Sequence, residues 1–179
     1  MRIDSWTAAA AALTLATACS AGGGNSVPLL DYSATVPAGW QVRAPGNEMR
    51  IAEYTVRAAG ADSAEVVVYY FGEGQGGSVE ANVDRWSSQF SLPDGGPVTP
   101  AISKLEAAMF PTTLVELEGN YGRGMGMGPG RESATAGQAL DAAVVETPKG
   151  NLYIQLFGDS ASVRGARAEF LAFVQSIRG

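Results

Sequence analysis

The sequence has no histidine and only one cysteine among its 179 residues. Without histidine, the chain cannot supply an imidazole as a general acid or base, as the partner of a nucleophilic serine or cysteine, or as a metal ligand. A single cysteine excludes an internal disulfide, a thiolate zinc cluster and a paired-cysteine redox motif. The remaining chemistry must therefore rest on carboxylates, hydroxyls, amides, arginines and methionines.

Positive charge is scarce as well. The chain has 12 Lys and Arg residues against 18 Asp and Glu residues, a formal net charge of −6, and no stretch in which the basic residues gather. Binding to nucleic acid or to an anionic lipid surface needs such a basic cluster. We therefore expect no nucleic-acid partner. The length and the 46% of hydrophobic residues suit one globular domain preceded by a targeting segment.

The N-terminal segment has the features of an export signal. Residues 7–18 are an uncharged run of alanine, leucine and threonine, too short to span a bilayer but of the length of a signal-peptide core. Small residues then precede Cys19, and this pattern resembles the bacterial lipobox, in which the cysteine is lipidated and becomes the mature N-terminus. The alternative is an ordinary signal peptide cleaved after the Ala-Thr-Ala of residues 16–18. We expect residues 1–18 to be a signal peptide and Cys19 to carry the lipid.

A Gly- and Ser-rich stretch follows Cys19 and has the composition of a flexible tether. We expect residues 19–34 to be the lipidated cysteine and tether, and residues 35–179 to be a single globular domain. This predicts an exported protein of the cell envelope that meets the membrane through its lipid anchor. In a Gram-negative host, Ser20 after the cysteine favours the periplasmic face of the outer membrane.

Hydrophobic periodicity predicts several strands in the globular part. One segment is a continuous β-branched and aromatic run, typical of a central strand that is buried on both faces, and others alternate or flank a Pro-Lys turn as a hairpin. The predicted strands are 50–57, 64–71, 102–107, 112–121, 140–145 and 152–157.

Two segments have helical spacing. Residues 78–90 place Val79, Val83, Trp86 and Phe90 on one face, with Ser78 as the N-cap. The C-terminal segment carries an apolar stripe at helical spacing, with Ser160 or Ser162 as its N-cap; the stripe is Val163, Ala166, Phe170, Phe173, Val174 and Ile177. The order strands, helix, strands, helix, with hairpins dominating, predicts an α+β fold, an antiparallel sheet flanked by helices as an α/β/α sandwich.

The glycines of residues 72–77 have the G-x-G-x-x-G spacing of a dinucleotide-binding turn. Glu73 and Glu80 would place negative charge where a pyrophosphate would lie, and no parallel strand–helix–strand unit follows. We therefore interpret this segment as a sharp turn and expect no nucleotide and no cofactor.

Three features are candidates for chemistry or recognition. Glu116 and Glu118 lie on one face of a predicted strand, as the paired carboxylates of an envelope hydrolase would, although a solvated strand face has the same pattern. In the glycine-rich segment 122–137, Met125 and Met127 could hold Cu(I). The same methionines, bracketed by Arg123 and Arg131, also offer an adaptable surface for a partner. Trp40 in a Pro-Ala-Gly-Trp turn is a further candidate contact.

From residue 35 onward the layout resembles bacterial members of the PsbP-like (Mog-type) family. The resemblance rests on the Pro-Ala-Gly-Trp turn at 37–40, the strand at 66–71, the Gly-Gly-Ser entry at 76–78 into the Asn-Val-Asp-Arg-Trp helix at 82–86, and the late hairpin with the C-terminal helix. It implies a non-enzymatic binding or accessory domain with an envelope protein partner, and it transfers no functional residue. The alternative is an envelope hydrolase or a copper-handling protein that uses the carboxylate or methionine pair.

Overall fold

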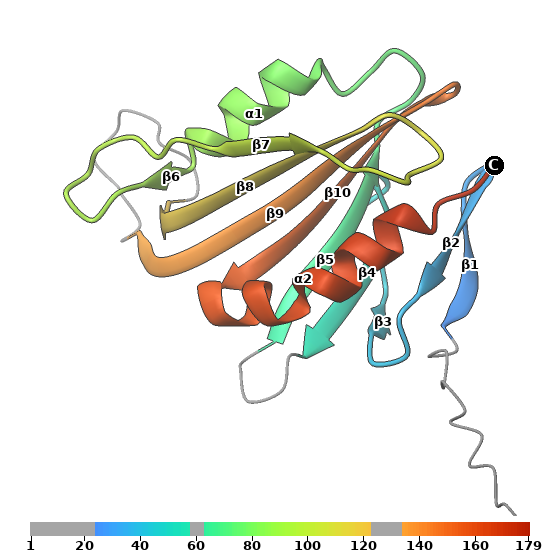
Figure 1. Cartoon of the computed structure of the whole chain (residues 1–179), viewed down its shortest axis with the longest axis horizontal. Coiled ribbons are helices and arrows are strands. Elements are labelled where there is room, and N and C mark those ends of the chain that lie inside the picture. The colour runs from blue at the N-terminus through green and yellow to red at the C-terminus, as the bar shows by residue number, and fades with distance from the viewer. Residues whose placement is uncertain (1–23, 58–62, 123–133) are drawn as a thin grey trace, which may run out of the picture.

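The structure is a computed structural model that describes residues 24–57, 63–122 and 134–179. Within these residues, eight strands form one antiparallel sheet in the order β3-β4-β5-β10-β9-β8-β6, with β7 also paired to β8, and β1 and β2 form a separate hairpin (Figure 1). The elements are β1 (Asn25–Leu29), β2 (Tyr32–Val36), β3 (Gln41–Arg43), β4 (Arg50–Arg57), β5 (Ser63–Tyr70), α1 (Val79–Ser87), β6 (Phe90–Ser91), β7 (Ala101–Lys104), β8 (Thr112–Tyr121), β9 (Thr135–Thr147), β10 (Gly150–Asp159) and α2 (Ser160–Gln175).

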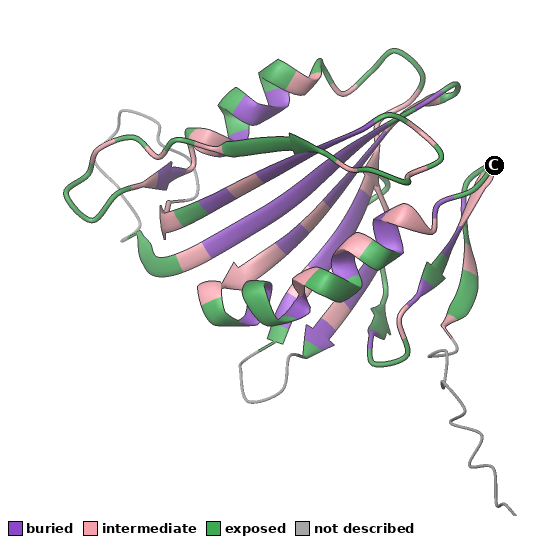
Figure 2. Ribbon diagram, viewed as in Figure 1, coloured by how far each residue is buried: buried purple, intermediate pink, exposed green. Residues whose placement is uncertain are grey.

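The sheet buries both of its faces around its middle strands (Figure 2). Because side chains alternate along a strand, Val66 and Ile154 join the core beneath α2, whereas Val144 and Tyr153 join a second core beneath α1. The predicted buried strand is therefore β5, with residues 66–68 each at most 4% exposed. The α+β class and the antiparallel sheet are confirmed.

Helix α1 begins as its sequence predicts. The Ser78 hydroxyl oxygen accepts a hydrogen bond from the Ala81 N–H at 3.1 Å, as an N-cap does. The helix ends at Ser87, however, and Phe90 lies in β6, so the helix predicted over 78–90 is too long. The periodicity persists beyond the helix because Phe90 is buried in the same core as Trp86.

Helix α2 carries five of the six residues of the predicted apolar stripe, and Ile177 lies just beyond its end. All six side chains are buried. Its N-cap is neither Ser160 nor Ser162 but Asp159, whose carboxylate accepts hydrogen bonds from the N–H groups of Ala161 and Ser162, both at 3.0 Å. A carboxylate at this position also interacts favourably with the helix dipole.

The folded part begins before residue 35. The hairpin of β1 and β2 uses residues that we assigned to the tether, and it buries Leu29 and Ala34 in the core beneath α2. Backbone hydrogen bonds of 2.9 Å in both directions join Ser33 to Arg178 near the C-terminus. The tether boundary at residue 34 is thus corrected, since the described chain forms strands from Asn25. Strand β9 begins at Thr135, inside the glycine-rich segment 122–137.

Candidate functional site

Two of the hollows in the described part of the chain lie on opposite faces of the sheet. The first, of about 340 Å³, lies between α2 and strands β7, β8 and β9 and is lined by Glu116, Glu118, Asp141, Arg164 and Arg167 among others; we call it the carboxylate hollow. The second, of about 480 Å³, lies beside α1 and is lined by Arg50, Tyr69, Phe71, Arg85, Tyr121 and Tyr153 among others; we call it the aromatic hollow. Both volumes are within the range of small-molecule sites.

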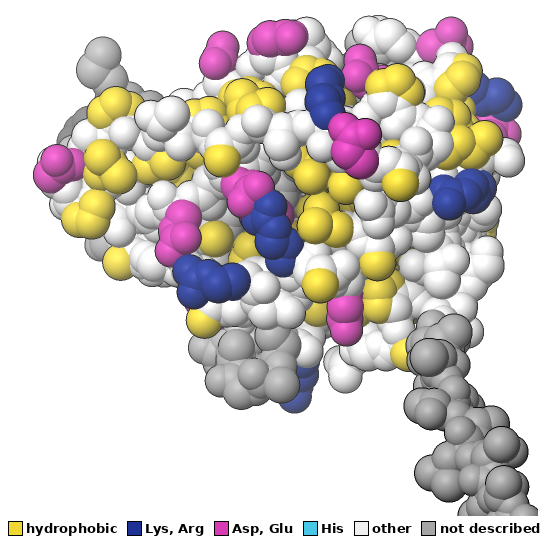
Figure 3. Space-filling model, viewed as in Figure 1, with side chains coloured by type: hydrophobic (Ala, Val, Ile, Leu, Met, Phe, Trp, Pro, Cys, Tyr) yellow, Lys and Arg dark blue, Asp and Glu magenta, His cyan; other side chains and the backbone are white. Residues whose placement is uncertain are grey.

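The carboxylate hollow contains the predicted glutamate pair. Glu116 forms an ion pair with Arg167 of α2. The Glu118 carboxylate lies 3.6 Å from the guanidinium of Arg164, which is on the same helix as Arg167. Figure 3 shows acidic and basic side chains interleaved between β8 and α2. The two glutamates therefore share a concave site, but each is paired with an arginine of α2. These two arginines are three residues apart.

Asp141 is a member of this hollow that we did not predict from the sequence. It is the strand partner of Glu116, and its carboxylate lies 3.2 Å from the Arg167 guanidinium. Burial raises the pKa of Asp141 to about 6, even though Arg167 acts to lower it, and Glu116 adds to the increase. An aspartate within an apolar run, between Leu140 and Ala142, was the available signal.

Trp40 is part of the core and not a surface contact. Its side chain is 8% exposed, its ring lies 5.5 Å from Tyr54 and 5.1 Å from Phe173, and its indole N–H donates a 2.8 Å hydrogen bond to Glu169. The turn of residues 37–40 places the Trp40 ring against Phe173 of α2 and does not leave it exposed for a partner. This candidate contact is corrected.

The other predicted site residues lie outside the described residues. These are Cys19, Arg123, Met125, Met127 and Arg131. Among the residues that the structure does describe, no group of three or more Cys, Asp or Glu side chains could hold a metal ion. No described helix is both long and apolar enough to cross a membrane.

The glycine segment 72–77 forms the turn that we expected. Four of its glycines have φ between +69° and +104°: Gly72, Gly74, Gly76 and Gly77. Glycine adopts such positive φ angles readily, because it has no Cβ atom. The carbonyl oxygens of Gly76 and Gly77 accept hydrogen bonds of 2.8 Å from the Asn82 amide and the Tyr153 hydroxyl. This turn thereby connects α1 to the sheet beneath it.

The aromatic hollow has two arginines on its walls and no carboxylate among its lining residues. Arg50 comes from β4, and Arg85 comes from α1. The Arg50 guanidinium lies 5.5 Å from the centre of the Tyr69 ring, in the geometry of a cation–π contact. Arg85 donates to the Asn82 side chain and forms no ion pair with any described residue.

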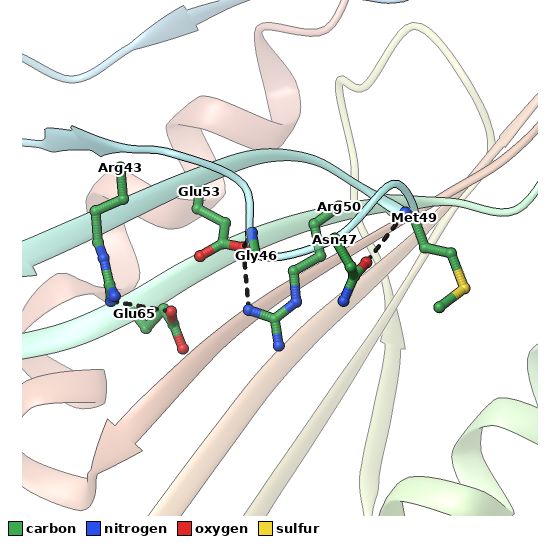
Figure 4. A network of polar contacts seen from close by, with 7 residues as sticks. All are labelled: Arg43, Gly46, Asn47, Met49, Arg50, Glu53 and Glu65. Carbon is green, nitrogen blue, oxygen red and sulfur yellow. Dashed lines mark hydrogen bonds and ion pairs between the residues drawn. The ribbon is translucent and has the colours of Figure 1, made fainter.

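Glu53 fixes the position of the Arg50 guanidinium through an ion pair. Its carboxylate, 3% exposed, accepts hydrogen bonds from Gly46 N–H at 2.6 Å and from the Arg50 guanidinium at 3.1 Å (Figure 4). Although burial acts to raise the pKa of Glu53, these two donors lower it overall, so the carboxylate is ionised at neutral pH. Arg50 Nε is buried and has no hydrogen-bond partner within the described chain.

Aromatic rings form much of the remaining wall. Tyr69 lies in β5, and Phe71 is the first residue after this strand; both side chains project from the same side. Their ring centres are 6.1 Å apart, and the ring planes are nearly parallel, with an angle of 4° between them. Phe71 also meets the Tyr153 ring edge to face at 5.4 Å. A continuous apolar run predicts a strand buried on both sides, because the run does not show which of its side chains remain open to solvent.

Comparisons with known proteins assign no family to this chain. No family model matches the chain, and no curated protein sequence matches it. Among solved structures, the chain is similar to PA94 from Pseudomonas aeruginosa, a protein of unknown function described as a candidate regulator. The two share 14% sequence identity over 88% of this chain and 98% of PA94, with a TM-score of 0.49.

Proposed function

We propose that this protein is an exported, lipid-anchored binding or accessory module without catalytic activity, and that it binds its envelope partner at the aromatic hollow. The observation that carries the binding site is the convergence of Arg50 and Arg85, from two separate elements, on a wall of aromatic rings that contains no carboxylate. Aromatic and arginine side chains are the residues most enriched where binding energy concentrates in protein interfaces.

The anchor is part of this proposal and rests on the sequence. Small residues precede Cys19, and a Gly-rich stretch separates it from β1. Changing Cys19 to Ala should move the protein from the membrane fraction to the soluble fraction. A variant that stays with the membrane, together with an intact mass of the wild type that shows no lipid, would overturn the anchor.

We also propose a PsbP-like arrangement, an α/β/α sandwich, as the finer description of the fold. Its support is the placement of α1 and α2 over separate cores on opposite faces of the antiparallel sheet. Such domains bind partners, which agrees with a module that has no histidine and whose glutamate pair is held by arginines.

Photo-crosslinking in the native envelope tests the binding site. A photoreactive phenylalanine analogue in place of Gln89, on the wall of the aromatic hollow, should give a discrete crosslinked product. The same analogue in place of Gln41, an exposed glutamine on the edge strand β3, is the matched control. Equal products at both positions, or none at Gln89, would contradict the proposed site.

One observation favours a second candidate function, an envelope hydrolase. Asp141, whose pKa is about 6, shares the carboxylate hollow with Glu116 and Glu118, and a carboxyl group with a raised pKa can act as a general acid. The arginine partners of both glutamates oppose this, because they hold the carboxylates that would act as base or nucleophile. Hydrolysis of a panel of chromogenic glycosides that is lost in Asp141→Asn would support the hydrolase.

A further inference from the structure

We infer that the aromatic hollow recognises one carboxylate group joined to an aromatic ring. This inference rests on the proposed function and names the chemistry of its ligand. The acid could be a free small molecule or an aromatic residue at the C-terminus of a partner protein, and the experiment below separates these two sources.

The charge of the hollow sets the charge of the ligand. Arg50 is already compensated by the ionised Glu53 behind it, whereas Arg85 has only the neutral Asn82 side chain as its partner among the described residues. Burial raises the pKa of Tyr69, although the charge of Arg50 acts to lower it. The Tyr69 hydroxyl therefore remains neutral. The hollow therefore offers one uncompensated positive charge, which suits a single carboxylate better than a doubly charged phosphate.

The guanidinium geometry suits the same group. A guanidinium presents parallel N–H donors that match the two oxygens of a carboxylate. Arg85 is exposed and can turn toward a ligand, while Arg50 is held by Glu53 and by the Tyr69 ring. The side-chain amides of Gln89 and Gln155 also line the hollow, where they can donate further hydrogen bonds to an acid group.

The rings supply a surface for a flat group. Tyr69 and Phe71 lie nearly parallel and are each only partly buried. Trp86 and Tyr153 also line the hollow and are 2% and 1% exposed. Aromatic pairs prefer offset or edge-to-face contacts at such surfaces. A volume of about 480 Å³ has room for one ring and its acid group.

Chemical-shift titration of the isotope-labelled full chain tests the inference. The free-acid probe is phenylpropionate, and its neutral control is phenylpropionamide. The chain-end probe is the peptide Gly-Gly-Phe, and its control is the same peptide with an amidated C-terminus. We expect both acids to give saturable shifts of the Trp86 indole, with the Trp40 indole on the opposite face unmoved, and both amides to bind about ten-fold more weakly.

The preferred source is the probe that binds more tightly. If phenylpropionate and Gly-Gly-Phe bind equally, the shared carboxylate and ring suffice. A Trp86 signal that moves equally with acids and amides, or with neither acid, would overturn the inference.

A pair of arginine variants localises the binding. Arg85→Gln should weaken phenylpropionate binding about ten-fold, because a charge-assisted hydrogen bond is lost. Arg57→Gln removes the same charge from an exposed position at the other end of β4 and should leave binding unchanged. Equal weakening by both variants would show general electrostatic attraction and overturn the assignment to this hollow.

The crosslinking and titration results can fail separately. A specific crosslink at Gln89 without a response to either acid would retain the proposed function and reject this ligand chemistry. Acid binding at Trp86 without a crosslinked envelope product would retain the ligand chemistry and reject the envelope partner.

Discussion

The Tyr153 ring lies so close to Gly76 that a Cβ atom placed there would come within 2.6 Å of it. Gly76 also has a φ of +89°. The turn between β5 and α1 therefore requires a glycine at this position for two separate reasons, its backbone angle and the ring beside it. Since Tyr153 lines the aromatic hollow, this contact connects the glycine turn to the candidate site.

Gly76→Ala should destabilise the fold more than Gly74→Ala. Gly74 has a φ of +69°, and a Cβ added there would meet nothing within 4 Å, so alanine causes only backbone strain, about 1 kcal/mol. At Gly76 the ring must also move, and we expect a loss of about 3 kcal/mol in the free energy of unfolding. Urea denaturation of both variants measures the difference, and equal losses would show that Tyr153 does not constrain the turn.

Asp159→Ala should weaken the start of α2. Its carboxylate accepts two backbone N–H groups, and removal of an N-cap costs about 1 kcal/mol. Ser160→Ala is the matched control, because the Ser160 hydroxyl donates one exposed hydrogen bond to Gly137 and is not the cap of α2. A larger loss of stability in Ser160→Ala than in Asp159→Ala would show that Ser160, one of the two caps predicted from the sequence, is the N-cap of α2.

The sequence predicted well those features that depend on short-range periodicity. The stripe of α2, the strand at 50–57 and the hairpin of β9 and β10 follow from spacing and turn residues alone. The cap of α2 was missed because Asp159 ends β10 and caps α2 at the same time, so strand periodicity and cap preference compete at one residue. The start of the fold was missed because β1 pairs only with β2 and has little alternation to mark it.

The sites were less predictable because they depend on side chains from distant segments. Arg50 and Arg85 lie on different elements, and only the pairing of β4 with β5 and the position of α1 bring them to one hollow. Trp40 is buried because Tyr54 and Phe173 pack against it from other elements, whereas a turn with proline and glycine suggests exposure. Glu116 and Glu118 were found because strand alternation alone places them on one face.

Phe170→Ala should leave a cavity beneath α2. Its side chain is fully buried in the core formed by α2 and the sheet, so the variant should lose about 3 to 5 kcal/mol in the free energy of unfolding. Arg164→Ala, on the exposed side of the same helix, should change stability by less than about 1 kcal/mol. Thermal denaturation compares the two, and a melting temperature of Phe170→Ala near that of wild type would show that α2 packs loosely.

Asp141 should make the stability of the fold depend on pH. Burial raises the pKa of Asp141 to about 6 in the folded protein, above its ordinary value of 3.8. The folded state thus binds this proton more tightly than the unfolded state. Its favourable contribution is fully present below about pH 4 and is lost as the pH rises through about 6.

Asp141→Asn removes this titration while it keeps the size and polarity of the side chain. We expect the variant to be more stable than wild type at pH 8, by up to about 3 kcal/mol, and to match wild type near pH 4. Arg167 keeps Glu116 as its partner in the variant, so its charge is not left unpaired. Glu118→Gln, which breaks an exposed ion pair in the same hollow, is the control and should show little dependence on pH. Urea midpoints measured at both pH values test the sign: if Asp141→Asn is less stable than wild type at pH 8, its ion pair with Arg167 outweighs the cost of burying the charge.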